Sequence, residues 1–507
     1  MLDGDRNNVG YHLRAAADRY GDRPFLTIDG VTMSFEEIDV ATQRAANALR
    51  ARGLRQGDHV AAVLGNSLDY VLSWLGAARA GIVFVPVNPS LKGDGLADLL
   101  EHSGSTLVIS APEVADQVAA VCARLPEVHE VLLATGDGPA LIGDAGDPGV
   151  ELKGGDPMMV MYTSGTTGKP KGIEIDHARC SAGRFILKAV GVEDTDRIFT
   201  SLPLFHANAA IISFWGAFKM GLPLSVGRRF SASRHWDEVR AAGATVFNAL
   251  GAMMPILYKQ PPRADDAANP CRLVISGACP KDLWRPFEER FGVKLVECYG
   301  TAEGALTIAG PDAPLGSIGK PVNAEAKVVR EDDTECDPNE IGELVTRPLG
   351  GSARVSYYKN DEASVAKIAG GWLHTGDRVY KDPEGFLWFV DRGDHFIRRR
   401  GENISSVEVE AVVERHPSVI EAAAYGIPSE MGEDEVAVAV VAHPGVTIDP
   451  VDLVEFCAQN MASFQVPRFV RVLSELPKTD THRAKKKVLA SEGRVEGMFD
   501  REDPDKS

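Results

Sequence analysis

Residues 162–172 read YTSGTTGKPKG, a segment that combines four hydroxyl side chains after its tyrosine with three glycines and two lysines. It lies between two apolar segments, residues 158–161 (MMVM) and 173–175 (IEI), that have the pattern of short strands. Gly165 and Gly168 can adopt a positive φ, which turns successive N–H groups toward one centre. The two lysines add positive charge to these donors. The segment is therefore a candidate phosphate-binding loop, although a solvent-exposed Ser/Thr/Gly connector would have a similar composition.

This loop differs from a Walker A loop. That motif requires Gly-x4-Gly-Lys-Ser/Thr in front of a helix. Here Gly168 and Lys169 are followed by Pro170, and the residues beyond predict a strand. The sequence therefore predicts a phosphate loop of another kind.

The bulk properties limit the classes of protein. A chain of 507 residues is long enough for two or more domains with large cores. A net charge of −18 argues against nucleic acid or an anionic membrane as the main partner. Seven cysteines without a C-x-x-C pair favour a reducing compartment over a disulfide framework or a zinc site. With no signal-peptide pattern, and with its most membrane-like stretch (residues 209–218) too short to span, the protein is expected to be cytoplasmic.

The order of predicted elements indicates an α/β multidomain protein. Ser34 and Ser67 each fit the N-cap of a helix. The strands expected between helices are nearly continuous apolar runs, which is typical of a parallel sheet covered on both faces. From about residue 316 short strands and turns predict a small β-barrel or sandwich. The expected strands of the first part are residues 58–64, 82–87, 245–250, 272–278 and 294–299, with helical segments near Met254 and Leu283.

The C-terminal part is expected to be a separate α+β unit of roughly 115 residues. Ser405 fits the N-cap of a helix, EVAVAVVAH reads as an alternating strand, and Asp449 with Pro450 would open another helix. The charged tail after Ser491 is expected to be loose.

Four further motifs follow the loop in a fixed order. They are ECYGTAEG (residues 297–304), GWLHTGD (371–377), DRGDHFIRRRGENIS (391–405) and LPKTDTHRAKKK (476–487). The series resembles the adenylate-forming superfamily of acyl-CoA synthetases, luciferases and peptide-synthetase adenylation domains, over nearly the whole chain. Within it, NALGAMMPILYKQPP (248–262) and RRRGENISSVEVE (398–410) look most like ligases of the crotonobetaine/carnitine–CoA kind.

The resemblance implies a fold and a reaction. The fold would be a large N-terminal domain of stacked α/β subdomains with a small β-barrel, and a small mobile C-terminal domain. In this chain they would span residues 1–390 (barrel about 316–390) and 391–507, with a hinge near Asp391. The reaction would join a small carboxylic acid to ATP with Mg²⁺, giving an acyl-adenylate and pyrophosphate, and then pass the acyl group to CoA. A homodimer is compatible with this resemblance.

The resemblance also implies the nucleotide site. Glu303 would hold the Mg²⁺ that ATP brings, since such an ion needs only one or two protein carboxylates. Asp377 would accept both ribose hydroxyls, and Arg392 would reach the ribose or phosphate. Small residues at Gly277 and Cys279 would let the backbone approach adenine. The residues expected at the nucleotide are Thr163, Ser164, Gly165, Thr166, Thr167, Gly168, Lys171, Gly277, Ala278, Cys279, Glu297, Tyr299, Gly300, Thr301, Asp377 and Arg392.

The acyl group and CoA would bind beside this site. His206 is expected to gate and orient the acyl group near the incoming thiol, although a lone histidine is more often structural. Gly401 and Glu402 resemble a CoA-tunnel segment. The residues expected around the acyl pocket are Asn208, Gly251, Ala252 and Met253.

Two positions depart from the family pattern. Ala302 stands where most members have Thr or Ser, so one hydroxyl contact to the α-phosphate is missing, at a cost of roughly 0.5–1.5 kcal/mol unless Thr301 compensates. Members also end with P-K-T-x-x-G-K, and here Arg483 occupies the position of the catalytic lysine. Lys485 is the rival cation, because in an extended segment it would share the face of Arg483, whereas Lys486 would point to the opposite face.

Three functions stay open from the sequence. The first is an acid–CoA ligase. The second is an adenylating enzyme that passes its acid to an amine or a carrier protein. The third is a catalytically impaired nucleotide-binding relative, suggested by Ala302 and Arg483.

Overall fold

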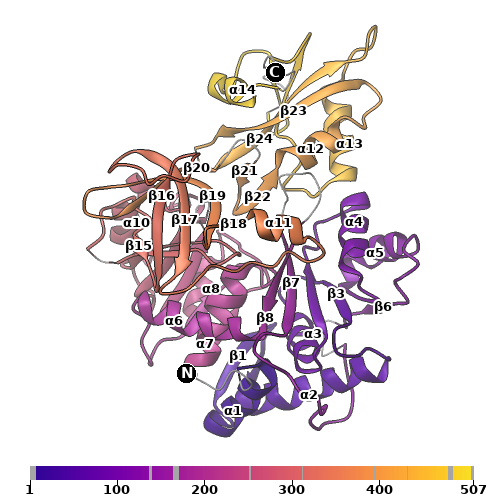
Figure 1. Cartoon of the computed structure of the whole chain (residues 1–507), viewed down its shortest axis with the longest axis vertical. Coiled ribbons are helices and arrows are strands. Elements are labelled where there is room, and N and C mark those ends of the chain that lie inside the picture. Colours follow the sequence, from indigo (N-terminus) through magenta and orange to yellow (C-terminus); the bar gives the residue numbers. More distant parts are fainter. Residues whose placement is uncertain are drawn as a thin grey trace.

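The structure is a computed structural model that describes residues 7–135, 140–163, 171–250, 253–310, 312–392, 396–430, 432–477 and 484–503. Figure 1 shows the N-terminal half at the base, the short-stranded orange part beside it, and the C-terminal part above. Among the described residues no helix is both long and apolar enough to cross a membrane.

The loop candidate belongs to a six-stranded sheet. Its strands are parallel except for the last pair, β7 and β8, which are antiparallel. Nearly all residues of its central strands are buried, as expected for strands covered on both faces. Helix α3 (Leu68–Arg79) connects the neighbouring strands β3 and β4, and α4 (Gly93–Ser103) leads from β4 to β5, on the other side of β3. The order is β6 (Glu130–Leu133), β5 (Leu107–Ser110), β3 (His59–Val63), β4 (Val83–Val87), β7 (Pro157–Thr163), β8 (Lys171–Asp176).

A nine-stranded sheet carries most of the other motifs. Its central strands run parallel and its two ends are antiparallel. One large apolar core joins both sheets to the helices α1 (Val9–Tyr20) and α2 (Phe35–Ala51). The order is β15 (Lys320–Pro321), β14 (Leu306–Ala309), β13 (Lys294–Gly300), β12 (Leu273–Gly277), β11 (Val246–Leu250), β9 (Ile198–Thr200), β10 (Leu224–Val226), β1 (Pro24–Ile28), β2 (Val31–Ser34).

Helix starts follow the capping pattern of the sequence. Ser34 accepts the Glu37 N–H at 3.1 Å, and the Glu37 carboxylate accepts the Ser34 N–H at 2.7 Å, which completes a capping box. Ser67 and Ser405 also cap helices, as predicted. The expected helical segments are α9 (Met253–Tyr258) and α10 (Lys281–Phe291).

The turn-rich part forms an antiparallel five-stranded sheet around a small core that includes Val328, Leu344 and Val379. Its strands are β16 (Ala324–Val329), β17 (Ile341–Pro348), β18 (Ile368–Ala369), β19 (Trp372–Lys381) and β20 (Leu387–Arg392). The short strands expected from residue 316 onward are therefore present.

The C-terminal part is an α+β unit with its own apolar core. It begins with the hairpin β21 (Phe396–Arg399) and β22 (Glu402–Ser405), which leads into α12 (Ser406–Val413). Its sheet has the order β23 (Val419–Pro428), β24 (Asp434–Ala442), β25 (Phe469–Leu473), β26 (Phe499–Asp500), with helices α13 (Pro450–Asn460) and α14 (Lys486–Glu492).

The prediction of a loose tail after Ser491 was wrong up to the end of β26. Strand β26 pairs with β25, and Asp500 is fully buried. The Asp500 carboxylate accepts from Arg468 Nε at 3.0 Å and from Arg468 Nη2 at 3.2 Å. Pairing with arginine allows a charged segment to be part of a sheet.

Candidate active site

The phosphate-loop candidate is described only at its two ends. Thr163 at the end of β7 pairs with Lys171 at the start of β8. The expected ligands Ser164, Gly165, Thr166, Thr167 and Gly168 lie outside the described residues. The Lys171 ammonium lies 5.9 Å from the centre of the Tyr357 ring, so the one described cation of the loop faces the turn-rich part.

Glu303 contacts the same tyrosine, Tyr357, that lies beside Lys171. Its Oε1 accepts a hydrogen bond from the Tyr357 hydroxyl at 3.0 Å. Beneath it, Arg179 donates from Nη2 to the Ala302 carbonyl at 3.0 Å, and burial lowers the pKa of Arg179, opposed by Asp176 and Glu303. The structure thus adds two residues that the motifs did not indicate, Tyr357 and Arg179.

The turn before Glu303 is held by its own backbone. Thr301 N–H donates to the Ala305 carbonyl at 3.0 Å, and the Thr301 hydroxyl accepts the Ala305 N–H at 3.3 Å. A hydroxyl that accepts one bond can still donate one. The Thr301 hydroxyl can therefore still donate a hydrogen bond beside Ala302.

The expected adenine wall is fixed by a buried carboxylate. Glu297 is 4% exposed and accepts the N–H groups of Ala278 and, at 3.3 Å, of Cys279. Ala278 has φ 69°, a left-handed conformation that side chains other than glycine rarely adopt. Burial raises the pKa of Glu297 to about 7, although the two N–H bonds act in the opposite direction. Burial also raises the pKa of the Cys279 thiol, which fits a wall residue and not a nucleophile.

The expected ribose ligands lie on neighbouring strands. Asp377, 2% exposed, accepts a hydrogen bond from the Tyr299 hydroxyl. Asp377 on β19 is also the cross-strand partner of Arg392, the last residue of β20, whose side chain lies outside the described part. Gly300 ends β13 directly after Tyr299. Residues from three separate motifs therefore meet at one point.

The acyl end of the site lies where the C-terminal part contacts the N-terminal part. The His206 Nε2 and Glu402 Oε1 atoms are 2.9 Å apart. Burial opposes the charge of Glu402, but His206 and Arg398 outweigh it and lower the pKa of the Glu402 carboxyl. Gly401 has φ 82°, and a Cβ there would lie 2.9 Å from Leu250 Cδ1, so glycine permits this close approach.

Of the expected acyl-pocket residues, Gly251 and Ala252 lie outside the described part. Met253 starts α9 and is 6% exposed. Asn208 starts η4 (Asn208–Trp215), a π-helix, and accepts a hydrogen bond from Asn248. Asn248 is a further residue that sequence reasoning missed.

Of the C-terminal cations, the structure describes Lys485 and Lys486 at the start of α14. Lys485 is exposed at the N-cap of α14, and Arg483 lies outside the described part. Lys486 donates to Ser406 Oγ at 2.8 Å and pairs with Glu410 at 2.7 Å. The sequence comparison placed Lys485 and Lys486 on opposite faces of an extended segment. In the structure Lys486 is the first residue of a helix, so that extended geometry does not continue beyond Lys485. In Figure 1, α14 lies at the far end of the C-terminal part, remote from the N-terminal part.

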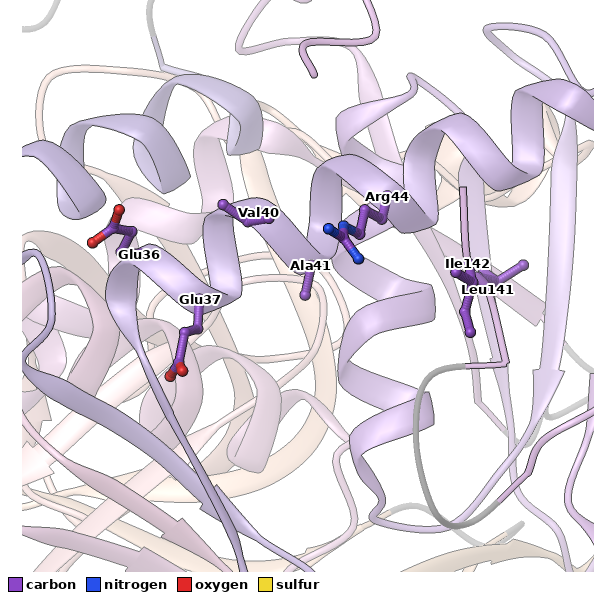
Figure 2. A pocket seen from close by; sticks show the side chains of 7 residues that line it. All are labelled: Glu36, Glu37, Val40, Ala41, Arg44, Leu141 and Ile142. Atoms are coloured by element: carbon purple, nitrogen blue, oxygen red, sulfur yellow. The ribbon is translucent and has the colours of Figure 1, made fainter. Parts of the chain in front are cut away.

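A cavity of about 370 Å³ lies elsewhere, along α2. Figure 2 shows that its side chains come from that helix and from one neighbouring segment. None of the expected site residues belongs to it. It is lined by Glu36, Glu37, Val40, Ala41, Arg44, Leu141 and Ile142.

The two family matches cover most of the chain. The family model for AMP-binding enzymes matches residues 13–352, and the model for the AMP-binding enzyme C-terminal domain matches residues 408–483. The chain belongs to the AMP-binding enzyme family. This family is the adenylate-forming superfamily that the motifs resemble. A crotonobetaine/carnitine–CoA ligase of Salmonella arizonae is 30% identical to this AMP-binding enzyme, over 95% of this chain and 99% of that protein.

Solved structures of related enzymes have the same fold. An o-succinylbenzoate CoA synthetase of Bacillus subtilis, bound to its product analogue OSB-NCoA, is 26% identical with a TM-score of 0.84, over 95% of this chain and 98% of that one. The same B. subtilis enzyme in complex with AMP gives a TM-score of 0.67, over 94% of this chain and 97% of that one. An amide bond synthetase of Marinactinospora thermotolerans has a TM-score of 0.83 at 23% identity, over 95% of this chain and 99% of that one, which shows the fold alone.

Proposed function

We propose that this AMP-binding enzyme is an AMP-forming acid–CoA ligase. A carboxylate oxygen attacks the α-phosphorus of ATP, the bond to the bridging oxygen breaks, and pyrophosphate leaves. The thiolate of CoA then attacks the acyl carbon, and AMP leaves as the thioester forms. The observation that carries this proposal is the contact of Glu402 with His206, because it brings the segment expected to line the CoA tunnel against the acyl end of the site.

The domain arrangement supports the second half of this reaction. The chain superimposes better on the B. subtilis enzyme with its CoA product analogue than on the same enzyme with AMP. In this arrangement His206 contacts Glu402, and α14, which carries Lys486, lies at the far end of the C-terminal part. We propose that the unit of residues 391–507 rotates about Asp391 and brings Arg483 or Lys485 to the α-phosphate for the first half-reaction.

The nucleotide residues have complementary roles in this proposal. The loop with Lys171 neutralises the β- and γ-phosphates, and Asp377 holds the ribose beside the Tyr299 hydroxyl. Glu297 fixes the Ala278 and Cys279 backbone against adenine.

Glu303 fits a magnesium ligand. Tyr357 donates a hydrogen bond to one of its carboxylate oxygens, and within the described part of the chain the other oxygen accepts none. No group of three or more His, Cys, Asp or Glu side chains that could hold a metal occurs among the described residues. A single carboxylate with phosphate oxygens suits Mg²⁺, which would supply charge neutralisation on the triphosphate.

The test is a screen of acids for pyrophosphate release with ATP, with and without CoA, and with product detection by mass spectrometry. We expect acid-dependent pyrophosphate release in both conditions and an acyl-CoA product only with CoA. If the acyl-adenylate is consumed only when an amine is added, the acceptor is an amine and not CoA. No release with any acid would refute the proposed ligase.

A further inference from the structure

Two amide side chains contact each other at the acyl end of the site, a buried one from Asn248 and a half-buried one from Asn208. Asn248, the third residue of β11, is 2% exposed and donates from Nδ2 to Asn208 Oδ1. In the described part of the chain, the buried Oδ1 of Asn248 has no hydrogen-bond partner. An unsatisfied buried acceptor destabilises the folded state, because it has lost its hydrogen bonds to water. Such an atom at this place indicates a missing donor.

Each amide lies two residues along its element from a residue at the contact between the two parts of the chain. On one side, Asn208 follows His206 by two residues, and His206 contacts Glu402. On the other side, Leu250 lies two residues beyond Asn248 on the same face of β11, and Leu250 approaches Gly401. The segment before η4 and the end of β11 therefore both connect an amide to the place where acyl transfer is proposed.

The helix that carries Asn208 is a second observation at the same point. Residues Asn208–Trp215 form a π-helix, a rare geometry that occurs frequently at functional sites. The helix packs into the large apolar core, where Ala209, Ala210 and Phe214 are fully buried. A polar pair at the start of such a helix has no evident packing advantage over apolar side chains.

The surrounding elements define the charge of the missing partner. The sequences of β11 (VFNAL), β12 (LVISG) and η4 (NAAIISFW) contain no charged residue. A second carboxylate on the acid would find no cation on these elements, and an ammonium group would find no carboxylate there. The amides therefore fit a neutral polar group.

We infer that the acid used by this enzyme carries a hydroxyl group, which Asn248 and Asn208 recognise by hydrogen bonds. A hydroxyl both donates and accepts, so it satisfies the amide pair in either orientation of the amide groups. This inference rests on the proposed ligase function. It assigns a substrate class, hydroxy acids, to the same site.

The test compares acids that differ in one hydroxyl: lactate with propionate, mandelate with phenylacetate, and salicylate with benzoate. We expect kcat/KM for pyrophosphate release to favour the hydroxy acid of at least one pair by roughly 100-fold or more. Sites that hydrogen-bond a substrate hydroxyl can reject the analogue that lacks it by a factor of about 10⁴. Malonate and betaine serve as charged controls and should be poor substrates.

Asn248→Leu should reverse this preference, lowering kcat/KM for the hydroxy acid by about 100-fold while raising it for the apolar analogue. The matched control is Asn66→Ala. Asn66 is also buried, but it bonds the backbone of Leu202, Leu204 and Gly227. That variant should lower kcat/KM for both acids of a pair equally.

The outcomes separate the inference from the ligase function. Acyl-CoA formation with no preference within any pair would refute the hydroxy-acid inference and leave the ligase intact. A preference in pyrophosphate release without a CoA product would support the inference and refute CoA as acceptor. If Asn248→Leu lowers kcat/KM equally for both acids of a pair, the amide pair has a structural role and the inference is refuted. No release with any acid would overturn both proposals.

Discussion

Glu297→Gln should change how the stability of the N-terminal part depends on pH. Glu297 is 4% exposed, and burial raises its pKa from an ordinary 4.5 to about 7. One pKa unit corresponds to about 1.4 kcal/mol, so the ionised side chain costs the folded state about 3 kcal/mol. Between pH 4.5 and 7 the folded chain keeps a proton that the unfolded chain has released. Stability therefore falls as the pH rises through this window, and stays low above it.

Glutamine removes this dependence because it does not titrate. It keeps one oxygen for the Ala278 or the Cys279 N–H and leaves the other N–H without its partner, at a cost of about 1 kcal/mol. At pH 5 the wild type has already lost about 0.8 kcal/mol, so the variant should be only slightly less stable there, and at pH 8.5 it should be about 2 kcal/mol more stable. Its KM for ATP should rise, because the wall at Ala278 loses one of its two anchors.

The assay is thermal unfolding of both proteins at the two pH values, read as the difference in Tm. This difference should change sign, by a few degrees in total. The matched control is Glu288→Gln, which removes another buried carboxylate of the same part of the chain, one that pairs with Arg285 at 2.6 Å. A Tm difference for Glu297→Gln that stays constant with pH would refute the reasoning that burial penalises this charge.

Three more outcomes are expected. Tyr357→Phe removes the hydroxyl that holds Glu303 and should raise the Mg²⁺ concentration for half-maximal pyrophosphate release by about fivefold, as fits one hydrogen bond; an unchanged magnesium titration would separate Tyr357 from the metal. Asp391→Pro fixes φ at the expected hinge and should leave one half-reaction while abolishing the other; equal loss of both, measured by pyrophosphate release and by thioester formation from preformed acyl-adenylate, would contradict rotation. Lys485→Ala should lower adenylation by orders of magnitude and spare thioester formation, whereas Lys486→Ala should mainly lower Tm, since Lys486 pairs with Glu410; the reverse result would exchange their roles.

Local patterns in the sequence predicted most of the fold. The caps at Ser34, Ser67 and Ser405 and the buried strands β3, β4, β11 and β13 lie where the sequence placed them, because these features depend on neighbouring residues. The ordered tail was missed because its stability comes from Arg468, which is distant in sequence from Asp500.

The site was predictable where one motif carries both the residue and its role. Tyr357 and Arg179 were not, because each reaches the Glu303 turn from a different sheet or helix, and nothing in their local sequence records that contact. The Asn248–Asn208 pair is of the same kind, since it forms only when β11 and η4 pack together. The positions of the loop ligands and of Arg483 stay predictions, because these residues lie outside the described part.

The anchoring of Lys486 has a consequence for the order of events. Its bonds to Ser406 and Glu410 fasten α14 to α12, and α12 continues directly from β22, which carries Glu402. Lys485 at one end and Glu402 at the other therefore belong to one rigid piece. In the proposed rotation, a turn of that piece that brings Lys485 to the nucleotide would carry Glu402 away from His206, and the return would do the opposite. The thiol would then gain access only after the activating cation has withdrawn, so the finished thioester would not be exposed to the group that helped to make the adenylate.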